Sequence, residues 1–172
     1  PVWSDELQHH ASGCYSATSM VKQLNRRAEF WLRSAEKWNT IAALTTDLPA
    51  ATEKFAEAWR DVCFNQFHDI LCGCSIMEAY DDVRDSMGGA MTVAAKEENK
   101  ALLKLSLNID TWLDGVSDSV TCHERHHCRN LRFPRPIVVF NPLAHDVESP
   151  VRTYHPSKRV VAVSYTHLTL PT

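Results

Sequence analysis

A histidine and an aspartate lie side by side in an otherwise apolar stretch of the chain, Cys63-Phe64-Asn65-Gln66-Phe67-His68-Asp69-Ile70-Leu71-Cys72-Gly73-Cys74-Ser75. An imidazole suits zinc, and a carboxylate can bind a metal ion or sugar hydroxyls. By residue type alone, such a pair is more often a hydrogen-bonded structural pair. Cys72 and Cys74 have no second cysteine pair nearby, so a metal site formed by these two with His68 has little support.

A second group of candidate ligands runs Cys122-His123-Glu124-Arg125-His126-His127-Cys128. These side chains are soft enough for zinc, but they are crowded together. Structural zinc sites usually draw on two separated pairs of ligands, and the sequence shows no such arrangement here. We interpret the cluster as a polar linker and predict no specific metal there.

The overall composition is that of a globular protein. The 172 residues include 44% hydrophobic residues, and 18 Lys and Arg against 21 Asp and Glu give a formal net charge of -3. This balance argues against a nucleic-acid partner held by bulk positive charge. No apolar run approaches the roughly 20 residues needed to cross a bilayer, so we expect no membrane partner. No signal peptide is visible, and we expect reduced cysteines and a cytoplasmic location.

The elements that position the His-Asp pair are predicted to be helices. In the first, apolar residues recur at alternating spacings of three and four, which places them on one helical stripe. Ser16 or Ser19 is the expected N-cap of this helix. The stripe consists of Val21, Leu24, Ala28, Trp31, Ala35, Trp38 and Ala42.

A second helix is expected to start with Asp47 as N-cap and Pro49 in its first turn. It carries the apolar residues Phe55, Trp59, Val62, Phe67 and Ile70 and ends near Gly73. A third helix is expected to start at Ser75, with Glu78 completing a capping box, and to run to Ile109. Three long helices with short connections predict an antiparallel three-helix bundle over residues 1–110.

The pattern changes after residue 110, and the predicted fold class is mainly α with an incomplete β part. Residues 111–135 read as an irregular linker. Residues 136–162 read as the beginning of a β domain, with strands at Ile137–Phe140, Val147–Val151 and Arg159–Val161. Three strands are too few to close a sandwich.

The last ten residues, Val163–Thr172, match the translation of a common transposase sequencing adapter in one reading frame. We therefore leave residues 163–172 out of the fold and function argument. The chain begins at Pro1 rather than Met. With the unfinished sheet, this is interpreted as a piece cut from a longer protein at both ends.

The segment Asn65–Leu71, followed by Gly73 and Ser75-Ile76, closely resembles the central domain of glycoside hydrolase family 38, the zinc-dependent α-mannosidases. The stretch Glu6–Ser16 is similar to the family's approach to that domain, so residues 1–15 are expected to lead in from an N-terminal catalytic domain. Lys22 and Asn25–Glu29 resemble the first helix, and Pro136–Leu143 resembles the opening of the C-terminal β domain.

The resemblance implies an enzyme that cleaves terminal α-mannosidic bonds with retention. In this family the zinc is held by a His-x-Asp pair and a second Asp, the nucleophile, from the N-terminal domain, and by one His from the central domain. His68 matches that central-domain ligand, and Asp69 matches a carboxylate that contacts substrate hydroxyls. The resemblance also suggests that His10 contacts the substrate. The alternative interpretation is a histidine in a solvated loop.

These matches predict a parent enzyme that acts on α-mannosides or mannose-containing oligosaccharides with one Zn²⁺ per active site. Its partner would be the N-terminal catalytic domain. Because the nucleophile and the acid/base belong to that domain, no catalytic residue is assigned in this chain, which is expected to be inactive alone. The alternative is a non-enzymatic helical-bundle interaction module in which the His-Asp string is incidental. A His-x-Asp motif upstream in the gene would distinguish the two.

Overall fold

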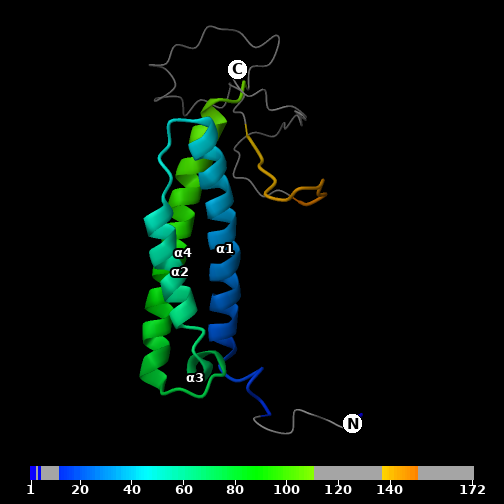
Figure 1. Ribbon diagram of the computed structural model, residues 1–172, viewed down its shortest axis with the longest axis vertical. Coiled ribbons are helices and arrows are strands. Elements are labelled where there is room, and N and C mark those ends of the chain that lie inside the picture. The colour runs from blue at the N-terminus through cyan, green and yellow to red at the C-terminus, as the bar shows by residue number, and fades with distance from the viewer. Residues whose placement is uncertain (3, 5–11, 111–136, 151–172) are drawn as a thin grey trace, which may run out of the picture. The chain divides into compact units, whose positions relative to one another are not determined.

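The computed structural model describes residues 1, 2, 4, 12–110 and 137–150. The chain divides into two compact units, residues 1–104 and 105–172. Four helices follow one another in the described residues: α1 (Ser19–Thr45), α2 (Thr52–Phe64), α3 (His68–Leu71) and α4 (Met77–Leu107). The three long helices lie side by side with alternating directions, and α3 lies at one end of them, in the connection from α2 to α4 (Figure 1). The predicted mainly helical fold is therefore confirmed.

One apolar core joins the three long helices. Its largest fully buried side chains include Leu32 of α1, Val62 of α2, and Tyr80 and Met87 of α4. Ile70 of the short helix α3 belongs to the same cluster. Burial of this kind of surface contributes about 25 cal/mol per Å². The core therefore fixes α3 as well as the long helices.

The buried stripe of α1 differs from the prediction at every second position. Val21, Ala28, Ala35 and Ala42 are buried as expected, but Asn25, Leu32 and Asn39 complete the stripe. Trp31, which was predicted to lie on the stripe, is 44% exposed. The side-chain oxygens of both asparagines accept hydrogen bonds from outside α1, whereas the buried Asn39 Nδ2 has no hydrogen-bond partner among the described residues. The Asn39 Oδ1 accepts the Ala51 amide at 2.9 Å.

The predicted starts of α1 and α2 are wrong. The N-cap of α1 is Thr18, in a left-handed conformation (φ 46°) without a side-chain cap bond. The hydroxyl of Thr18 instead donates to the carbonyl oxygen of Gly73 at 3.3 Å. The helix α2 begins at Thr52 rather than near Asp47. The Asp47 carboxylate accepts a hydrogen bond from Lys104 at 2.8 Å, which lowers the pKa of Asp47.

The predicted capping box of the third helix is also wrong. Ser75 lies two residues before α4, which begins at Met77. Its backbone amide donates to the Tyr80 hydroxyl at 2.9 Å. In the predicted capping box this amide would donate to the Glu78 carboxylate. In the structure it donates to the hydroxyl of the core residue Tyr80 instead. The pair Gly88-Gly89 does not interrupt α4, which is continuous through both residues.

The predicted second helix is divided into two. The helix α2 ends at Phe64, and a turn separates it from α3. Asn65 makes this break: its Nδ2 donates to the Asp61 carbonyl oxygen and to the Ser86 Oγ, both at 2.7 Å. One side chain thus satisfies a terminal carbonyl of α2 and ties the turn to α4.

Residues 137–150 contain no strand, although Ile137–Phe140 was predicted to form one. Asn141 instead closes a turn, accepting the Leu143 amide at 2.9 Å and donating to the His145 carbonyl oxygen at 2.7 Å. The rest of the predicted β domain, the linker 111–135 and residues 163–172 lie outside the described residues, and these boundaries stay predictions. Among the described residues, no helix is both long and apolar enough to cross a membrane.

Candidate functional site

The predicted His-Asp pair forms the first turn of α3, at the end of the bundle (Figure 1). Both side chains face solvent: His68 is 78% exposed and Asp69 is 50% exposed. The His68 Nε2 lies 3.5 Å from the Asp69 Oδ1, so the two groups are neighbours without a short hydrogen bond. The Phe67 ring packs against the imidazole with ring centroids 4.2 Å apart and planes tilted by 51°. This contact limits the orientations open to the His68 ring.

Several large apolar side chains near the pair in the sequence are exposed. Phe64 at the end of α2, Phe67, and Ile76 and Met77 at the start of α4 are all more than 40% exposed. Of these, the Phe67 ring contacts the His68 imidazole directly. Exposed apolar side chains next to polar groups are typical of binding surfaces.

Contacts from the start of α1 hold α3 from one side. The Lys22 ammonium donates to the carbonyl oxygens of Ala17 at 2.5 Å and Leu71 at 2.8 Å. The Leu71 carbonyl belongs to the last residue of α3, which leaves its terminal carbonyls without helical partners. Lys22 thus stabilises the C-terminus of α3 and joins it to the N-terminus of α1.

Gly73 allows the close approach that these bonds require. Its φ of +86° lies in the left-handed region, which side chains with a Cβ rarely adopt. A Cβ on Gly73 would lie 2.7 Å from the Ala17 carbonyl oxygen and 2.9 Å from its carbon. Both the conformation and the contact therefore call for glycine, which also ends α3 as the sequence predicted for the second helix.

Tyr80 holds α3 from the side of α4. The residue is 2% exposed, and its hydroxyl accepts the Ser75 amide at 2.9 Å. The same hydroxyl donates to the carbonyl oxygen of Asp69 at 3.5 Å. A buried tyrosine hydroxyl usually finds partners, and here both partners belong to the segment around the candidate site.

The polar residues before the pair are structural anchors. The Gln66 Nε2 donates to the Asn25 Oδ1 at 3.0 Å and to the Glu29 Oε1 at 3.1 Å, both on α1. Asn65 bonds to α4 through Ser86, as described above. The side chains of Asn65 and Gln66 thus form hydrogen bonds that join the helices, whereas the side chains of His68 and Asp69 remain accessible to solvent.

Three residues that position the pair were not assigned such a role from the sequence: Lys22, Gln66 and Tyr80. The position of Tyr80 on an apolar stripe could have indicated its role, because a buried tyrosine hydroxyl needs a hydrogen-bond partner. The bonds from Lys22 to Leu71 and from Gln66 to Asn25 join residues that are more than 35 positions apart along the chain. No local spacing could indicate them.

The donors around the pair fit one side of a metal site. Within the described ranges, no group of three or more His, Cys, Asp or Glu side chains could hold an ion. The Cys74 thiol lies 3.8 Å from the Asp69 Oδ1 and adds one sulfur to the neighbourhood. A four-coordinate zinc would thus need donors from outside this group. His10 and the cluster Cys122–Cys128 lie outside the described residues, so the structure does not place them.

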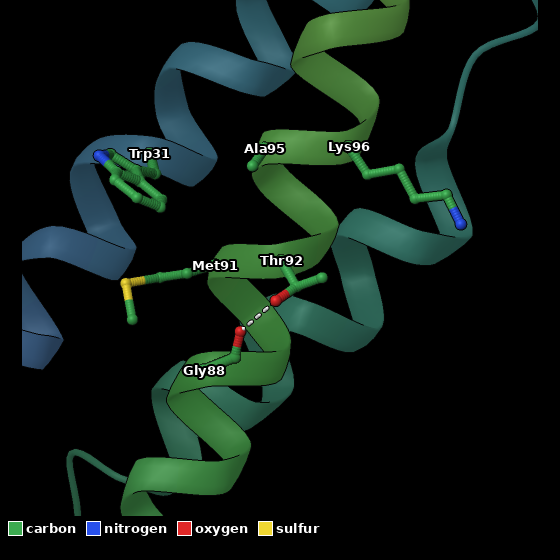
Figure 2. Close-up of a pocket in the computed structure, with 6 residues that line it drawn as sticks. All are labelled: Trp31, Gly88, Met91, Thr92, Ala95 and Lys96. Atoms are coloured by element: carbon green, nitrogen blue, oxygen red, sulfur yellow. Dashed lines mark hydrogen bonds between the residues drawn. The ribbon is translucent and has the colours of Figure 1, made fainter.

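A separate groove lies along the middle of the bundle, between α1 and α4 (Figure 2). It is open to solvent and has a volume of about 480 Å³. Trp31 of α1 faces Met91 and Ala95 of α4, and the Thr92 hydroxyl donates to the Gly88 carbonyl oxygen one turn earlier in α4, at 2.8 Å (Figure 2). None of the predicted site residues lines it.

Comparison with known proteins agrees with the resemblance seen in the sequence. A search of curated proteins finds no match. The family model described as the alpha mannosidase middle domain matches residues 9–105, which is more than half of the chain. The matched range contains the three long helices nearly to the end of α4, and also the pair on α3. The chain therefore belongs to the α-mannosidase middle-domain family, as the resemblance to glycoside hydrolase family 38 implied.

Proposed function

We propose that this chain is the part of a retaining, zinc-dependent α-mannosidase that supplies one zinc ligand, His68, and one substrate-contacting carboxylate, Asp69. The substrate would be a terminal α-mannoside or a mannose-containing oligosaccharide. One observation carries the proposal: the polar side chains of Asn65 and Gln66 bond to other helices, whereas the imidazole of His68 and the carboxylate of Asp69 are presented to solvent on a braced turn.

The bracing matters because a ligand must be held before the metal arrives. Lys22 of α1 and Tyr80 of α4 each donate a hydrogen bond to a carbonyl oxygen of α3, and Phe67 packs on the imidazole ring. A site built on a supported element keeps its geometry with a smaller entropy cost on binding. These contacts support a role for His68 and Asp69 outside the stability of the bundle itself.

The donors of this chain fit such a site as one component of it. His68 would bind the zinc through a ring nitrogen, and Asp69 would accept hydrogen bonds from sugar hydroxyls. When bound, the zinc would act as a Lewis acid that holds the mannose hydroxyls. The remaining ligands would come from an N-terminal catalytic domain.

The bond-breaking groups are proposed to lie in that domain too. A retaining glycosidase uses two carboxyl groups about 5–5.5 Å apart, one as nucleophile and one as acid/base. By the resemblance, both belong to the N-terminal domain. We therefore propose that this chain alone hydrolyses no α-mannoside. Turnover of an aryl α-mannoside by the isolated chain, abolished by a chelator, would contradict this.

The zinc assignment can be tested in an enzyme that contains this chain joined to the N-terminal domain encoded upstream. His68→Ala should lower zinc retention at least about tenfold, because a lost donor weakens a four-ligand site. Zinc per chain is measured by elemental mass spectrometry after dialysis. The matched control is His145→Ala, an exposed histidine outside α3. Equal zinc retention by both variants would sink the assignment.

The substrate role of Asp69 needs a separate readout. Asp69→Asn should keep the zinc but raise KM for an aryl α-mannoside, because an amide replaces a strong acceptor for sugar hydroxyls. Circular dichroism checks that the fold is unchanged. If the chain were instead a non-enzymatic interaction module, neither variant would change zinc content or turnover.

A further inference from the structure

Two half-buried cysteines from distant parts of the sequence lie on two segments that pack against each other next to the candidate site. Cys14 lies in the turn before α1, and Cys72 directly follows α3. Neither residue has a role in the zinc or substrate assignments above. Their positions are of interest because Cys72 adjoins the helix that carries His68 and Asp69.

The backbones around the two cysteines are held together by several contacts. Residues 13–17 form a compact turn, in which the Gly13 carbonyl oxygen accepts the amides of Ser16 at 3.0 Å and Ala17 at 2.8 Å. Ala17 in turn lies against Gly73, the neighbour of Cys72, closely enough that an added Cβ would clash. The turn that carries Cys14 thus packs directly on the segment that carries Cys72.

Hydrogen bonds fix this arrangement in place. Lys22 donates to carbonyl oxygens on both sides of it, at Ala17 and Leu71. Thr18 donates to the Gly73 carbonyl oxygen. Within this frame, burial raises the pKa of the Cys72 thiol, and the nearby Cys14 thiol raises it further. Both half-buried cysteines therefore belong to the contact between the turn and the end of α3.

We propose that Cys14 and Cys72 form a reversible disulfide that fastens the N-terminal turn to the end of α3. The oxidant is a small-molecule disulfide such as oxidised glutathione. The thiolate of one cysteine attacks a sulfur of that disulfide, forming a mixed disulfide and releasing one small thiol. The second cysteine then loses its proton and attacks the mixed disulfide, forming the Cys14–Cys72 bond and releasing the second small thiol.

The other cysteines of the helical bundle are placed differently. The Cys74 thiol is exposed and contacts the carbonyl oxygen and the Oδ1 of Asp69, at 3.6 and 3.8 Å. Cys63 is exposed on α2. Since Cys63 is also a free thiol but lies on another element, it provides a matched control.

The surroundings of Cys72 predict how fast the bond forms. Burial raises the pKa of the Cys72 thiol, and the Cys14 thiol and the Asp69 carboxylate raise it further, against the opposing charge of Lys22. Because the thiolate is the reacting form, exchange should be slow near neutral pH and accelerate as the pH rises. The reduced pair is thus protected from casual oxidation and closes under sustained oxidising conditions.

Closure should stabilise the domain measurably. A disulfide between residues 14 and 72 closes a long loop, which removes conformational freedom mainly from the unfolded chain. For a domain of about 100 residues the expected rise in Tm is roughly 10 °C. The bond also ties Cys72 to the turn, which restricts movement of the neighbouring α3.

The experiment uses the full 172-residue chain. The protein is equilibrated in mildly alkaline glutathione buffers of increasing oxidising strength, free thiols are then blocked, and peptides are mapped by mass spectrometry. We expect the Cys14–Cys72 cross-link as the main product and the roughly 10 °C rise in Tm. Cys63→Ser should retain both results, and Cys14→Ser and Cys72→Ser should lose both.

Two results would overturn the proposal. One is the absence of a Cys14–Cys72 peptide at every oxidising strength. The other is a dominant pairing of Cys72 with Cys74, or of either proposed partner with Cys122 or Cys128. Each variant is first melted in its reduced form, so that a folding defect of the substitution itself is separated from the loss of the cross-link.

Discussion

The substitution Gly73→Ala tests whether the close contact between the start of α1 and the end of α3 holds the site segment in place. Gly73 has a φ of +86°, and its missing Cβ would lie 2.7 Å from the Ala17 carbonyl oxygen. The left-handed conformation costs an alanine about 1–2 kcal/mol. Relief of the clash must move backbone on one side, at a further cost of about 1–3 kcal/mol.

These costs are partly offset in the unfolded state. An alanine has less conformational freedom there than a glycine, which favours folding by about 0.4–1 kcal/mol. The net expectation is a loss of about 2–4 kcal/mol in the free energy of unfolding, which is large against the usual 5–15 kcal/mol of a native domain. The shift of backbone would also weaken the Thr18–Gly73 hydrogen bond.

Urea denaturation followed by circular dichroism measures this difference, with Gly88→Ala as the matched control. Gly88 lies inside α4, and an added Cβ there meets nothing within 4 Å. Alanine is the better helix former, so Gly88→Ala should stabilise the protein by about 0.5–1 kcal/mol. The reasoning is refuted if Gly73→Ala unfolds within about 0.5 kcal/mol of the parent chain, or if the two substitutions change stability in the same direction.

Three further predictions concern the polar contacts of the bundle. Glu97 is 4% exposed; burial alone would raise its pKa, but hydrogen bonds and charges from two lysines outweigh burial and lower it. The pKa of Glu97 is lower in the folded state than in the unfolded state. The contribution of its ionised carboxylate to the free energy of unfolding is therefore present at neutral pH and is lost as the pH falls through the folded-state pKa. Glu97→Gln should therefore lower the free energy of unfolding by about 1–3 kcal/mol at pH 7 and by progressively less in acid. The control Asp85→Asn, on the exposed face of α4, should change it by no more than about 0.5 kcal/mol. Urea denaturation at several pH values measures both, and the same pH dependence in the two variants would contradict the prediction. Tyr80→Phe removes the hydroxyl that bonds to Ser75 and Asp69, and should lower the free energy of unfolding by about 1 kcal/mol. It should also speed amide hydrogen exchange around α3, and unchanged exchange there would argue against the bracing role. Asn65→Ala should cost about 1–3 kcal/mol, and a double-mutant cycle with Ser86→Ala should give a coupling of at least about 0.5 kcal/mol; additive effects would show that this bond contributes little.

The comparison of sequence and structure is clearest along α1. The alternating spacing correctly indicated that Val21, Ala28, Ala35 and Ala42 share a buried face. It placed Trp31 on that face as well, but the structure buries Leu32 and leaves Trp31 nearly half exposed. Hydrophobic periodicity fixes the direction of a face to within about one residue. It cannot anticipate that Asn25 belongs on the face, because its amide partner is Gln66 of another segment.

The helix ends show the same limit. Local signals favoured Asp47 and Ser75 as caps, and both residues instead bond to groups on α4, Lys104 and Tyr80. A capping preference is worth about 1 kcal/mol, so one tertiary hydrogen bond or ion pair is enough to override it. The boundaries of the elements were therefore less predictable than their existence.

The sequence by itself determined the family, the helical class and the identity of the candidate pair. Residues 65–75 carry enough specific side chains to indicate an α-mannosidase middle domain, and the family match over residues 9–105 agrees. Only the tertiary structure decided that His68 and Asp69 lie on a separate helix with both side chains exposed. The physical reason is that residue type and spacing encode local chemistry, whereas exposure depends on which distant groups take up the neighbouring polar atoms. Here Lys22 and Tyr80 donate hydrogen bonds to carbonyl oxygens of α3, and the Asn25 side chain accepts one from the Gln66 amide, whereas the side chains of His68 and Asp69 stay accessible to solvent.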